Sequence, residues 1–267
     1  MGAGPFSEVN AERRATRVRR RFARLPSGLV RFDQDIRQAR VGTGIDVTGP
    51  YWIFATVSLD RGTVSYLHGR DLVRAPGPQY GVFFPPWSIV HCALERVQSR
   101  SCAVAGRGAI SAELPIQPVA FEMLPEDLPG SIAEMLEIMR TRRAFVAIGR
   151  EHAPSPLAHR VKTLIDEGFA DLPPLSALAA ALHTSPAVMS RYFSRDYGMP
   201  PVRYRHAIRV MDALMRLIGG EPVASVGASA GFDDLGQFYR QFGALALAPP
   251  GRYRIRSRNP KTRRRAR

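Results

Sequence analysis

The chain has 267 residues, a formal net charge of +15 and an isoelectric point of about 11.0. This length allows one or two domains with buried cores, and no apolar run is long enough to span a membrane. The excess of arginine over acidic residues favours a polyanionic partner, because each phosphate that a cation neutralises releases counterions. Cys92 and Cys102 lack the C-x-x-C spacing of a zinc site, and reduced thiols are expected in a cytoplasmic protein.

Both ends of the chain are rich in arginine. Residues 1–25 contain the segment AERRATRVRRRFARL, and residues 258–267 read RNPKTRRRAR. Blocks of like charge are usually disordered, so we predict a basic arm at residues 1–25 and a basic tail at residues 258–267. The arm either contacts phosphates or is a solvated segment with no role of its own, and the tail should add phosphate affinity without sequence preference.

Residues 26–125 have short apolar runs separated by glycine, proline and aspartate. This alternation predicts β-strands joined by turns, and we expect a small antiparallel β-barrel or sandwich. The many aromatic residues either fill an ordinary core or line a pocket for a small-molecule effector. The candidates for such a pocket are Trp52, Phe54, Tyr66, Phe84, Trp87 and His91.

His91 and Glu95 have the spacing H-x-x-x-E, with His68 as their one nearby partner. This is a sparse ligand set for a metal, so we expect no metal and no cofactor. The sequence also lacks a Ser-His-Asp set, a catalytic carboxylate pair and a phosphate loop, so we expect no enzyme activity.

Residues 126–150 carry an amphipathic pattern in which Ile132, Met135, Leu136 and Met139 share one helix face. This helix packs either on the β-rich region or against a second copy of the chain. The next seven residues, 151–157, contain two prolines and form the predicted linker.

A duplication organises residues 158–257. A shift of 49 residues places Arg191 on Arg240 and Phe193 on Phe242, and it also aligns Pro201 with Pro250. Such self-similarity marks a repeated supersecondary unit, and each copy has the pattern of helix, turn and helix.

The second helix of the first copy begins with Ser185 as N-cap and proline at the first helical position. In the second copy the turn is one residue longer, and Gly231 is suited to a positive φ there. Asp233 or Asp234 caps the following helix, and Asp234 with Gln237 has capping-box spacing.

An α-helix fits the major groove of DNA, so two such units in series predict a double-stranded DNA partner. The residues expected at the DNA surface are Ser185, Ala187, Ser190, Arg191 and Arg195 in the first unit, and Asp234, Leu235, Gln237, Tyr239 and Arg240 in the second. A helical bundle whose repeat is only a packing solution is the alternative.

These anchors resemble the DNA-binding domain of the AraC/XylS transcription regulators. The resemblance rests on Leu178, Ala179, Leu182, Ser185, Arg191, Phe193, Gly198, Pro201, Tyr204 and Arg209 in and after the first unit, and on Val226, Gly231, Phe232, Phe238, Arg240, Phe242, Pro250 and Tyr253 in the second. It implies an α+β chain in which a cupin-like β-domain for effector binding and dimerisation precedes an all-α domain with two helix-turn-helix units. It also implies a nucleoid-associated regulator, with a small-molecule effector, a second copy of the chain and RNA polymerase as further candidate partners.

Two positions depart from the family pattern. Gly227 replaces the usual alanine, which should weaken its helix by about 1 kcal/mol, and Gly236 replaces a common serine. We therefore expect the second unit to be the less stable. Two other hypotheses remain open: a nucleic-acid-binding protein driven by charge alone, and a metal-dependent sensor or enzyme with a DNA-targeting module.

Overall fold

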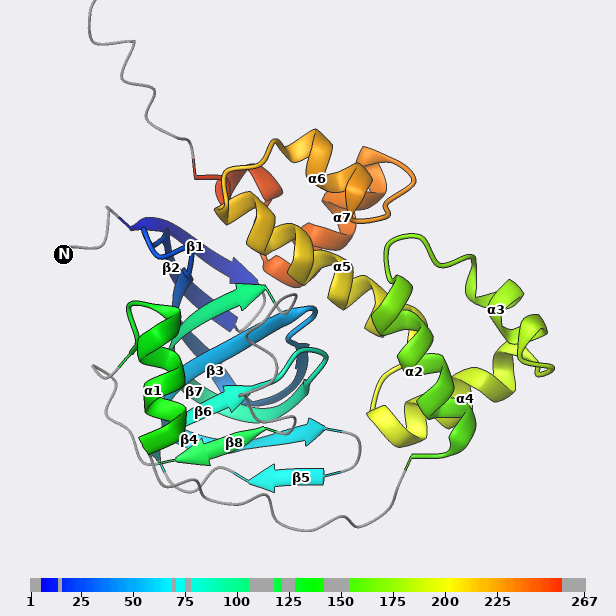
Figure 1. Cartoon of the computed structure of the whole chain (residues 1–267), viewed down its shortest axis with the longest axis horizontal. Helices are drawn as coiled ribbons and strands as arrows, with labels where there is room; N and C mark the ends of the chain where they lie inside the picture. Colours follow the sequence, from blue (N-terminus) through cyan, green and yellow to red (C-terminus); the bar gives the residue numbers. More distant parts are fainter. Residues whose placement is uncertain are drawn as a thin grey trace, which may run out of the picture.

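The computed structural model describes residues 6–13, 16–68, 71–74, 78–105, 118–121, 128–141 and 154–255. An antiparallel sheet forms the N-terminal part, and helices form the C-terminal part (Figure 1). The α+β organisation predicted from the sequence is therefore confirmed. Within the described ranges, no helix is long and apolar enough to cross a membrane.

The sheet consists of strands β1 (Ser7–Arg13), β2 (Thr16–Arg24), β3 (Val30–Val47), β4 (Tyr51–His68), β5 (Asp71–Arg74), β6 (Gln79–Phe84), β7 (Ile89–Ala105) and β8 (Val119–Phe121). The order is β1-β2-β3-β7-β4-β6-β8, and β5 pairs with β4. Register shifts interrupt the long strands β3 and β4. The pairing does not return from β8 to β1 among the described residues, so the sheet is barrel-like but open.

The basic arm predicted for residues 1–25 is wrong where the structure describes it, because these residues form β1 and β2. Val18 and Phe22 are buried on the inner face of β2, and Arg20 lies between them on that face, whereas Arg17, Arg19 and Arg21 are exposed on the outer face. Arg17 and Arg19 make ion pairs with Glu12 and Glu8 of β1, at 3.2 and 3.1 Å. The arginine block is therefore a strand with a charged outer face that acidic neighbours partly neutralise.

Helix α1 (Ile132–Thr141) packs on the sheet, within the predicted helical range of 126–150. Met135 is fully buried against Trp52, Phe54, Phe83 and Phe121. The apolar face of α1 is therefore covered by the β-domain of the same chain. The rest of the predicted helix up to residue 150, residues 151–153 of the linker and the tail at 258–267 lie outside the described residues.

The helical part contains α2 (Pro156–Gly168), α3 (Leu175–Ala181), α4 (Pro186–Tyr197), α5 (Pro201–Ile218), α6 (Val223–Ser229), α7 (Leu235–Ala246) and the 3-10 helix η2 (Pro250–Arg252). The long helix α5 connects a group formed by α2, α3 and α4 to a group formed by α6, α7 and η2 (Figure 1). Each group contains one of the two predicted helix-turn-helix units.

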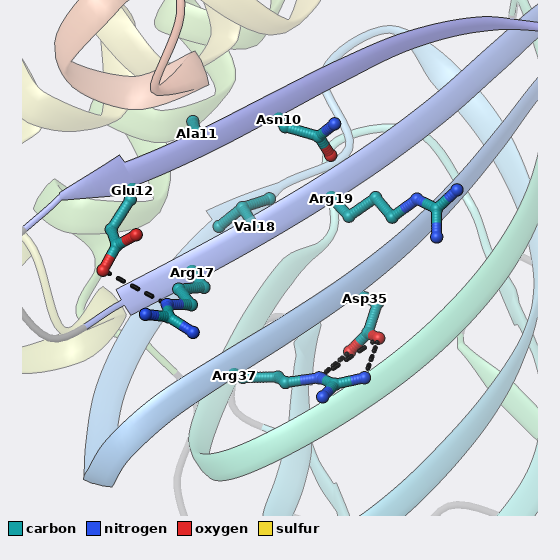
Figure 2. A pocket seen from close by; sticks show the side chains of 8 residues that line it. All are labelled: Asn10, Ala11, Glu12, Arg17, Val18, Arg19, Asp35 and Arg37. Atoms are coloured by element: carbon teal, nitrogen blue, oxygen red, sulfur yellow. Dashed lines mark hydrogen bonds and ion pairs between the residues drawn. The ribbon is translucent and has the colours of Figure 1, made fainter.

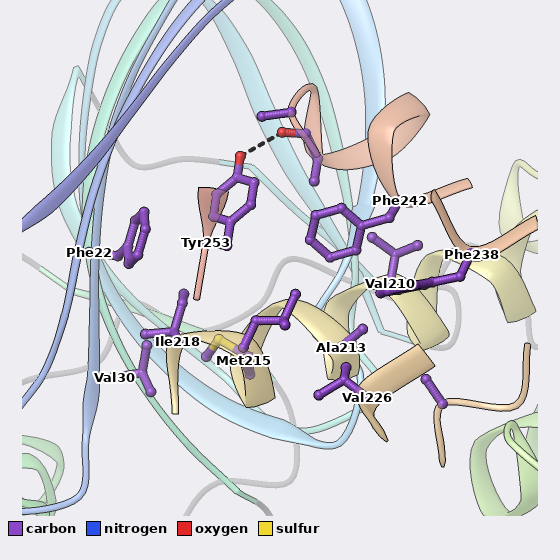
Figure 3. Packing of buried hydrophobic residues seen from close by; sticks show 14 of the residues in the cluster. Phe22, Val30, Val210, Ala213, Met215, Ile218, Val226, Phe238, Phe242 and Tyr253 are labelled. Atoms are coloured by element: carbon purple, nitrogen blue, oxygen red, sulfur yellow. Dashed lines mark hydrogen bonds between the residues drawn. The ribbon is translucent and has the colours of Figure 1, made fainter. Parts of the chain in front are cut away.

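The β-domain and the second group of helices share one hydrophobic cluster (Figure 3). Phe22 of β2 lies 5.4 Å from the Tyr253 ring, and both side chains are fully buried. Arg20 of the same strand donates hydrogen bonds to the Ala246 carbonyl and to the Tyr253 hydroxyl. Tyr51 donates to the Asp212 carboxylate of α5 at 3.1 Å. The two parts of the chain are therefore packed together through apolar and polar contacts.

Candidate nucleic-acid interface

The first helix-turn-helix unit is formed by α3, a four-residue turn and α4. The Ser185 side chain accepts a hydrogen bond from the Val188 backbone N–H, as expected for an N-cap followed by proline. His183 lies in the turn with a φ of 51°. Met189 and Phe193 bury the inner face of α4. The unit is thus held by local capping and by an apolar seam.

The outer face of α4 is accessible in the full chain. Ala187 and Arg191 are exposed, and Ser190 lies between them half-buried. Arg195 is also exposed, but its Nε donates to the buried Asp196 carboxylate at 2.8 Å. Arg191 therefore presents a less restrained guanidinium than Arg195 does.

The second unit, formed by α6 and α7, repeats this geometry. Helices α4 and α7 are related by 49 residues and α3 and α6 by 48, so the second turn is one residue longer. Gly231 has a φ of +83° and lies 48 residues after His183, so both turns use a left-handed residue at the same place. Asp234 caps α7 by accepting from the Gln237 backbone N–H at 2.6 Å. Only this half of the predicted capping box forms, because Gln237 Oε1 has no hydrogen-bond partner among the described residues.

The outer face of α7 carries exposed Leu235, Tyr239 and Arg240, and its inner face buries Phe238 and Phe242. The unusual Gly227 has a packing reason in the structure. A Cβ at this position would lie 2.9 Å from Cδ1 of Phe238, so α6 and α7 are too close for alanine. Glycine lowers the intrinsic helix propensity of α6, but it permits the close crossing of the two helices.

Arginines on α5 hold the loop between α2 and α3. Arg205 donates to the carbonyl groups of Phe169, Leu172 and Pro173, and Arg209 donates to Phe169 and Ala170. Burial, followed by the charge of Arg205, lowers the pKa of Arg209 to about 10, so this guanidinium remains charged at neutral pH. These bonds fix the loop that leads into the first unit to the connecting helix.

The second unit contacts the same loop. A Cβ on Gly231 would lie 2.2 Å from the Ala170 carbonyl oxygen, which shows how closely the turn approaches the loop backbone. The Phe232 ring lies 5.7 Å from the Arg209 guanidinium. The second unit therefore packs against the loop that precedes α3, so this loop and α5 together restrict how the second unit is oriented relative to the first.

The aromatic residues proposed for an effector pocket are distributed over several packing environments. Trp52 and Phe54 lie beneath α1, and Phe84 lies in a separate cluster with Tyr80 and Val82. Trp87 faces the helical part, with its ring 6.1 Å from that of Phe169.

His91 also faces the helical part. Its imidazole makes a hydrogen bond to the Tyr197 backbone, and it lies against Gly198. Burial nevertheless lowers the pKa of His91. Tyr66 belongs to β4, but its side chain lies outside the described part of the chain.

A shallow pocket on the outer surface of β1, β2 and β3 contains none of those aromatic residues (Figure 2). It is lined by Asn10, Ala11, Glu12, Arg17, Val18, Arg19, Asp35 and Arg37. Ion pairs between Arg17 and Glu12 and between Arg37 and Asp35 occupy its charged groups. An effector pocket therefore stays a prediction.

Arg205 and the contact surface of Gly231 were not identified as functional from the sequence. The repeated sequence pattern does predict that Gly231 adopts a left-handed conformation in the turn, and this is the one sequence feature that points to the contact. Nothing local in the sequence indicates that Arg205 binds three carbonyl groups more than thirty residues away, or that Arg20 reaches the end of α7.

Residues 178–256 match the family described as "Helix-turn-helix domain", over less than a third of the chain. No curated protein matches the chain. Similar solved structures include the C-terminal domain of AraT, a response regulator from Geobacillus stearothermophilus, with 24% identity over 40% of this chain and 93% of that chain and a TM-score of 0.36. ToxT from Vibrio cholerae aligns over 84% of this chain and 97% of its own, with 11% identity and a TM-score of 0.43. At these values the likenesses carry no functional conclusion.

Proposed function

We propose that this chain, whose residues 178–256 form a helix-turn-helix domain of the AraC type, is a transcription regulator that recognises specific DNA sequences. In this proposal α4 and α7 enter adjacent major grooves of double-stranded DNA. The observation that carries it is the repeated unit with both second helices exposed on their outer faces while their inner faces are buried.

The dimensions of the connection support two adjacent grooves. Helix α5 has 18 residues and is therefore about 27 Å long. Successive major grooves on one face of B-DNA are about 34 Å apart, so α5 and its flanking turns are of a suitable length. The contacts of residues 169–173 with α5 and with the second unit support a fixed spacing between the two recognition helices.

The side chains of α4 suit direct recognition of base edges. A guanidinium such as that of Arg191 binds both acceptors of guanine, and the Ser190 hydroxyl is able to donate or accept. Ala187 is small enough for close approach to the groove floor. Arg240 has the equivalent place on α7, and Arg195 is proposed to contact phosphate because Asp196 restrains it.

We further propose that the β-domain binds a small-molecule effector or a second copy of the chain, and that the regulator works in the cytoplasm, at the nucleoid, together with RNA polymerase. The proposal assigns no catalytic activity to the chain. These finer points are suggested by the AraC-type domain.

The first test is selection of bound sequences from a random duplex pool by the full chain at physiological salt. Enrichment of two blocks about one helical turn apart would support reading by both units. Binding without enrichment would favour the competing hypothesis of a nucleic-acid-binding protein driven by its net charge of +15.

A substitution tests the role of Arg191 in this proposal. Arg191→Ala should weaken binding to the selected duplex by about 1–3 kcal/mol and relax the preference at one base pair. Arg195→Ala is the matched control, and it should weaken binding to selected and random duplexes equally. Equal losses on both duplexes for Arg191→Ala would contradict base recognition by this side chain.

A further inference from the structure

The two recognition helices present different chemistry to solvent. Leu235 and Tyr239 of α7 are 50% and 46% exposed and lie one helical turn apart. The hydrophobic core does not need these two side chains, since Phe238 and Phe242 already fill the inner face of the same helix. An exposed apolar face on a recognition helix therefore calls for an apolar partner.

Leu235 and Tyr239 each pack against neighbouring residues of the second unit. Cδ2 of Leu235 would lie 3.3 Å from a Cβ placed on Gly227, so this side chain rests against α6. The Tyr239 ring lies edge-on to Phe238, with 5.9 Å between the ring centroids. Contacts of this kind restrict the side chains before binding, which lowers the entropy lost when a ligand is bound.

The internal duplication provides a direct comparison. The offset of 49 residues places Tyr239 at the position of Ser190, Gly236 at that of Ala187 and Leu235 at that of Pro186. The first unit thus presents a small hydroxyl between Ala187 and Arg191. The second presents leucine and tyrosine on either side of a glycine that has no side chain.

We infer that α7 recognises the C5-methyl groups of thymines through Leu235 and Tyr239, whereas α4 recognises a block that contains guanine. This inference rests on the proposed function. In the major groove the thymine methyl is the apolar feature that distinguishes one base pair from another, and guanine presents acceptors that suit an arginine. The block under α7 is therefore rich in T·A pairs.

Several features favour DNA over a protein as the occupant of this face. Arg240 lies on it next to Tyr239 and is exposed, so the apolar pair is accompanied by a cation suited to phosphate or base. The face also continues the proposed DNA interface, because it is the equivalent of the α4 surface in the repeated unit. The chain as a whole is strongly basic.

Replacement of thymine by uracil tests the inference, because it removes only the methyl group. The full chain is titrated with the duplex obtained by selection and with duplexes that carry uracil at one thymine at a time. Each contacted methyl in the α7 block should contribute about fourfold to the affinity. Uracil in the α4 block should have no effect.

Variants then connect the effect to side chains. Leu235→Ala and Tyr239→Ser should each lose the uracil effect at the thymine that the replaced side chain contacts, where the variant binds both duplexes at the weaker of the two wild-type affinities. Tyr239→Ser inserts the residue of the first unit, and it covers the case in which Leu235→Ala disturbs the contact with α6. Val202→Ala is the control, since Val202 is also 50% exposed but lies on α5, and it should keep the full methyl dependence.

Two outcomes overturn the inference in distinguishable ways. A two-block motif whose binding is insensitive to uracil, or whose second block lacks thymine, would overturn methyl recognition and leave the regulator intact. The absence of any enriched motif would overturn the proposed sequence-specific function and the inference together. Loss of the uracil effect in Leu235→Ala or Tyr239→Ser, with retention in Val202→Ala, would support it.

Discussion

The contact between the second helix-turn-helix unit and the loop before α3 requires glycine at position 231, because any side chain there would meet the Ala170 carbonyl oxygen. Gly231 combines a φ of +83° with a distance of 2.2 Å between a hypothetical Cβ and the Ala170 carbonyl oxygen. Alanine in the left-handed region costs about 1–2 kcal/mol. Forcing extra volume into a packed site costs typically about 1–3 kcal/mol more. We therefore expect Gly231→Ala to lower the free energy of unfolding by roughly 2–5 kcal/mol.

Gly28→Ala is the matched control for this prediction. Gly28 also has a positive φ, of +89°, but no atom lies within 4 Å of its hypothetical Cβ. It should show only the backbone cost of about 1–2 kcal/mol. Urea unfolding followed by helical circular dichroism measures both variants in the full chain. Equal destabilisation by the two substitutions would refute the view that the backbone contact at Ala170 holds the units together.

The same variant has a consequence for DNA. If Gly231→Ala separates the units without unfolding them, binding to a two-block duplex should weaken more than binding to a duplex with one block. Duplexes in which the spacing between the blocks is varied would report this directly. A wild-type dependence on spacing in Gly231→Ala would argue that α5 alone sets the distance.

Three further predictions concern packing and charge. Gly227→Ala should lower the free energy of unfolding by about 1–3 kcal/mol, because the added methyl group would meet the Phe238 ring. Alanine is the better helix former, so a variant that is more stable in urea unfolding would contradict this packing argument. Tyr51→Phe should cost about 1–3 kcal/mol by depriving the buried Asp212 carboxylate of a donor, and an unchanged unfolding midpoint would count against that contact. Burial lowers the pKa of His91 below its ordinary 6.5, so the imidazole binds a proton more readily in the unfolded chain than in the folded one. The contribution of neutral His91 to the free energy of unfolding should therefore be fully present above about pH 6.5 and be lost on acidification. His91→Gln should reduce the slope of the unfolding free energy between about pH 7.5 and 5.5.

Local patterns made the helical part predictable. The N-cap at Ser185, the cap at Asp234 and the left-handed Gly231 each depend on neighbours within a few residues. The duplication added information, because two copies of a weak pattern at one offset are more specific than either copy alone. The roles predicted for the exposed residues of α4 and α7 concern a partner and stay predictions.

Long-range pairing explains what the sequence did not predict. The arginine block at residues 17–21 has the composition of a disordered segment, but Val18 and Phe22 alternate with it and pair it into a sheet. From the sequence, Gly227 is expected only to weaken its helix. The residue that requires a glycine there, Phe238, lies eleven residues away on the next helix. Compensation of this kind appears only when the partners are placed in space.

The hydrophobic cluster shared by Phe22, Met215 and Tyr253 bears on how such a chain can be taken apart or recombined. A helical fragment cut out after the linker would expose apolar side chains that β2 and β3 now cover, and Arg20 would no longer cap the Ala246 carbonyl. Transplanting this helical half onto an unrelated sheet would require a new strand with an arginine and a phenylalanine two positions apart. A substitution on either surface would therefore remove contacts from the other half, and restoring them would require a matching substitution there.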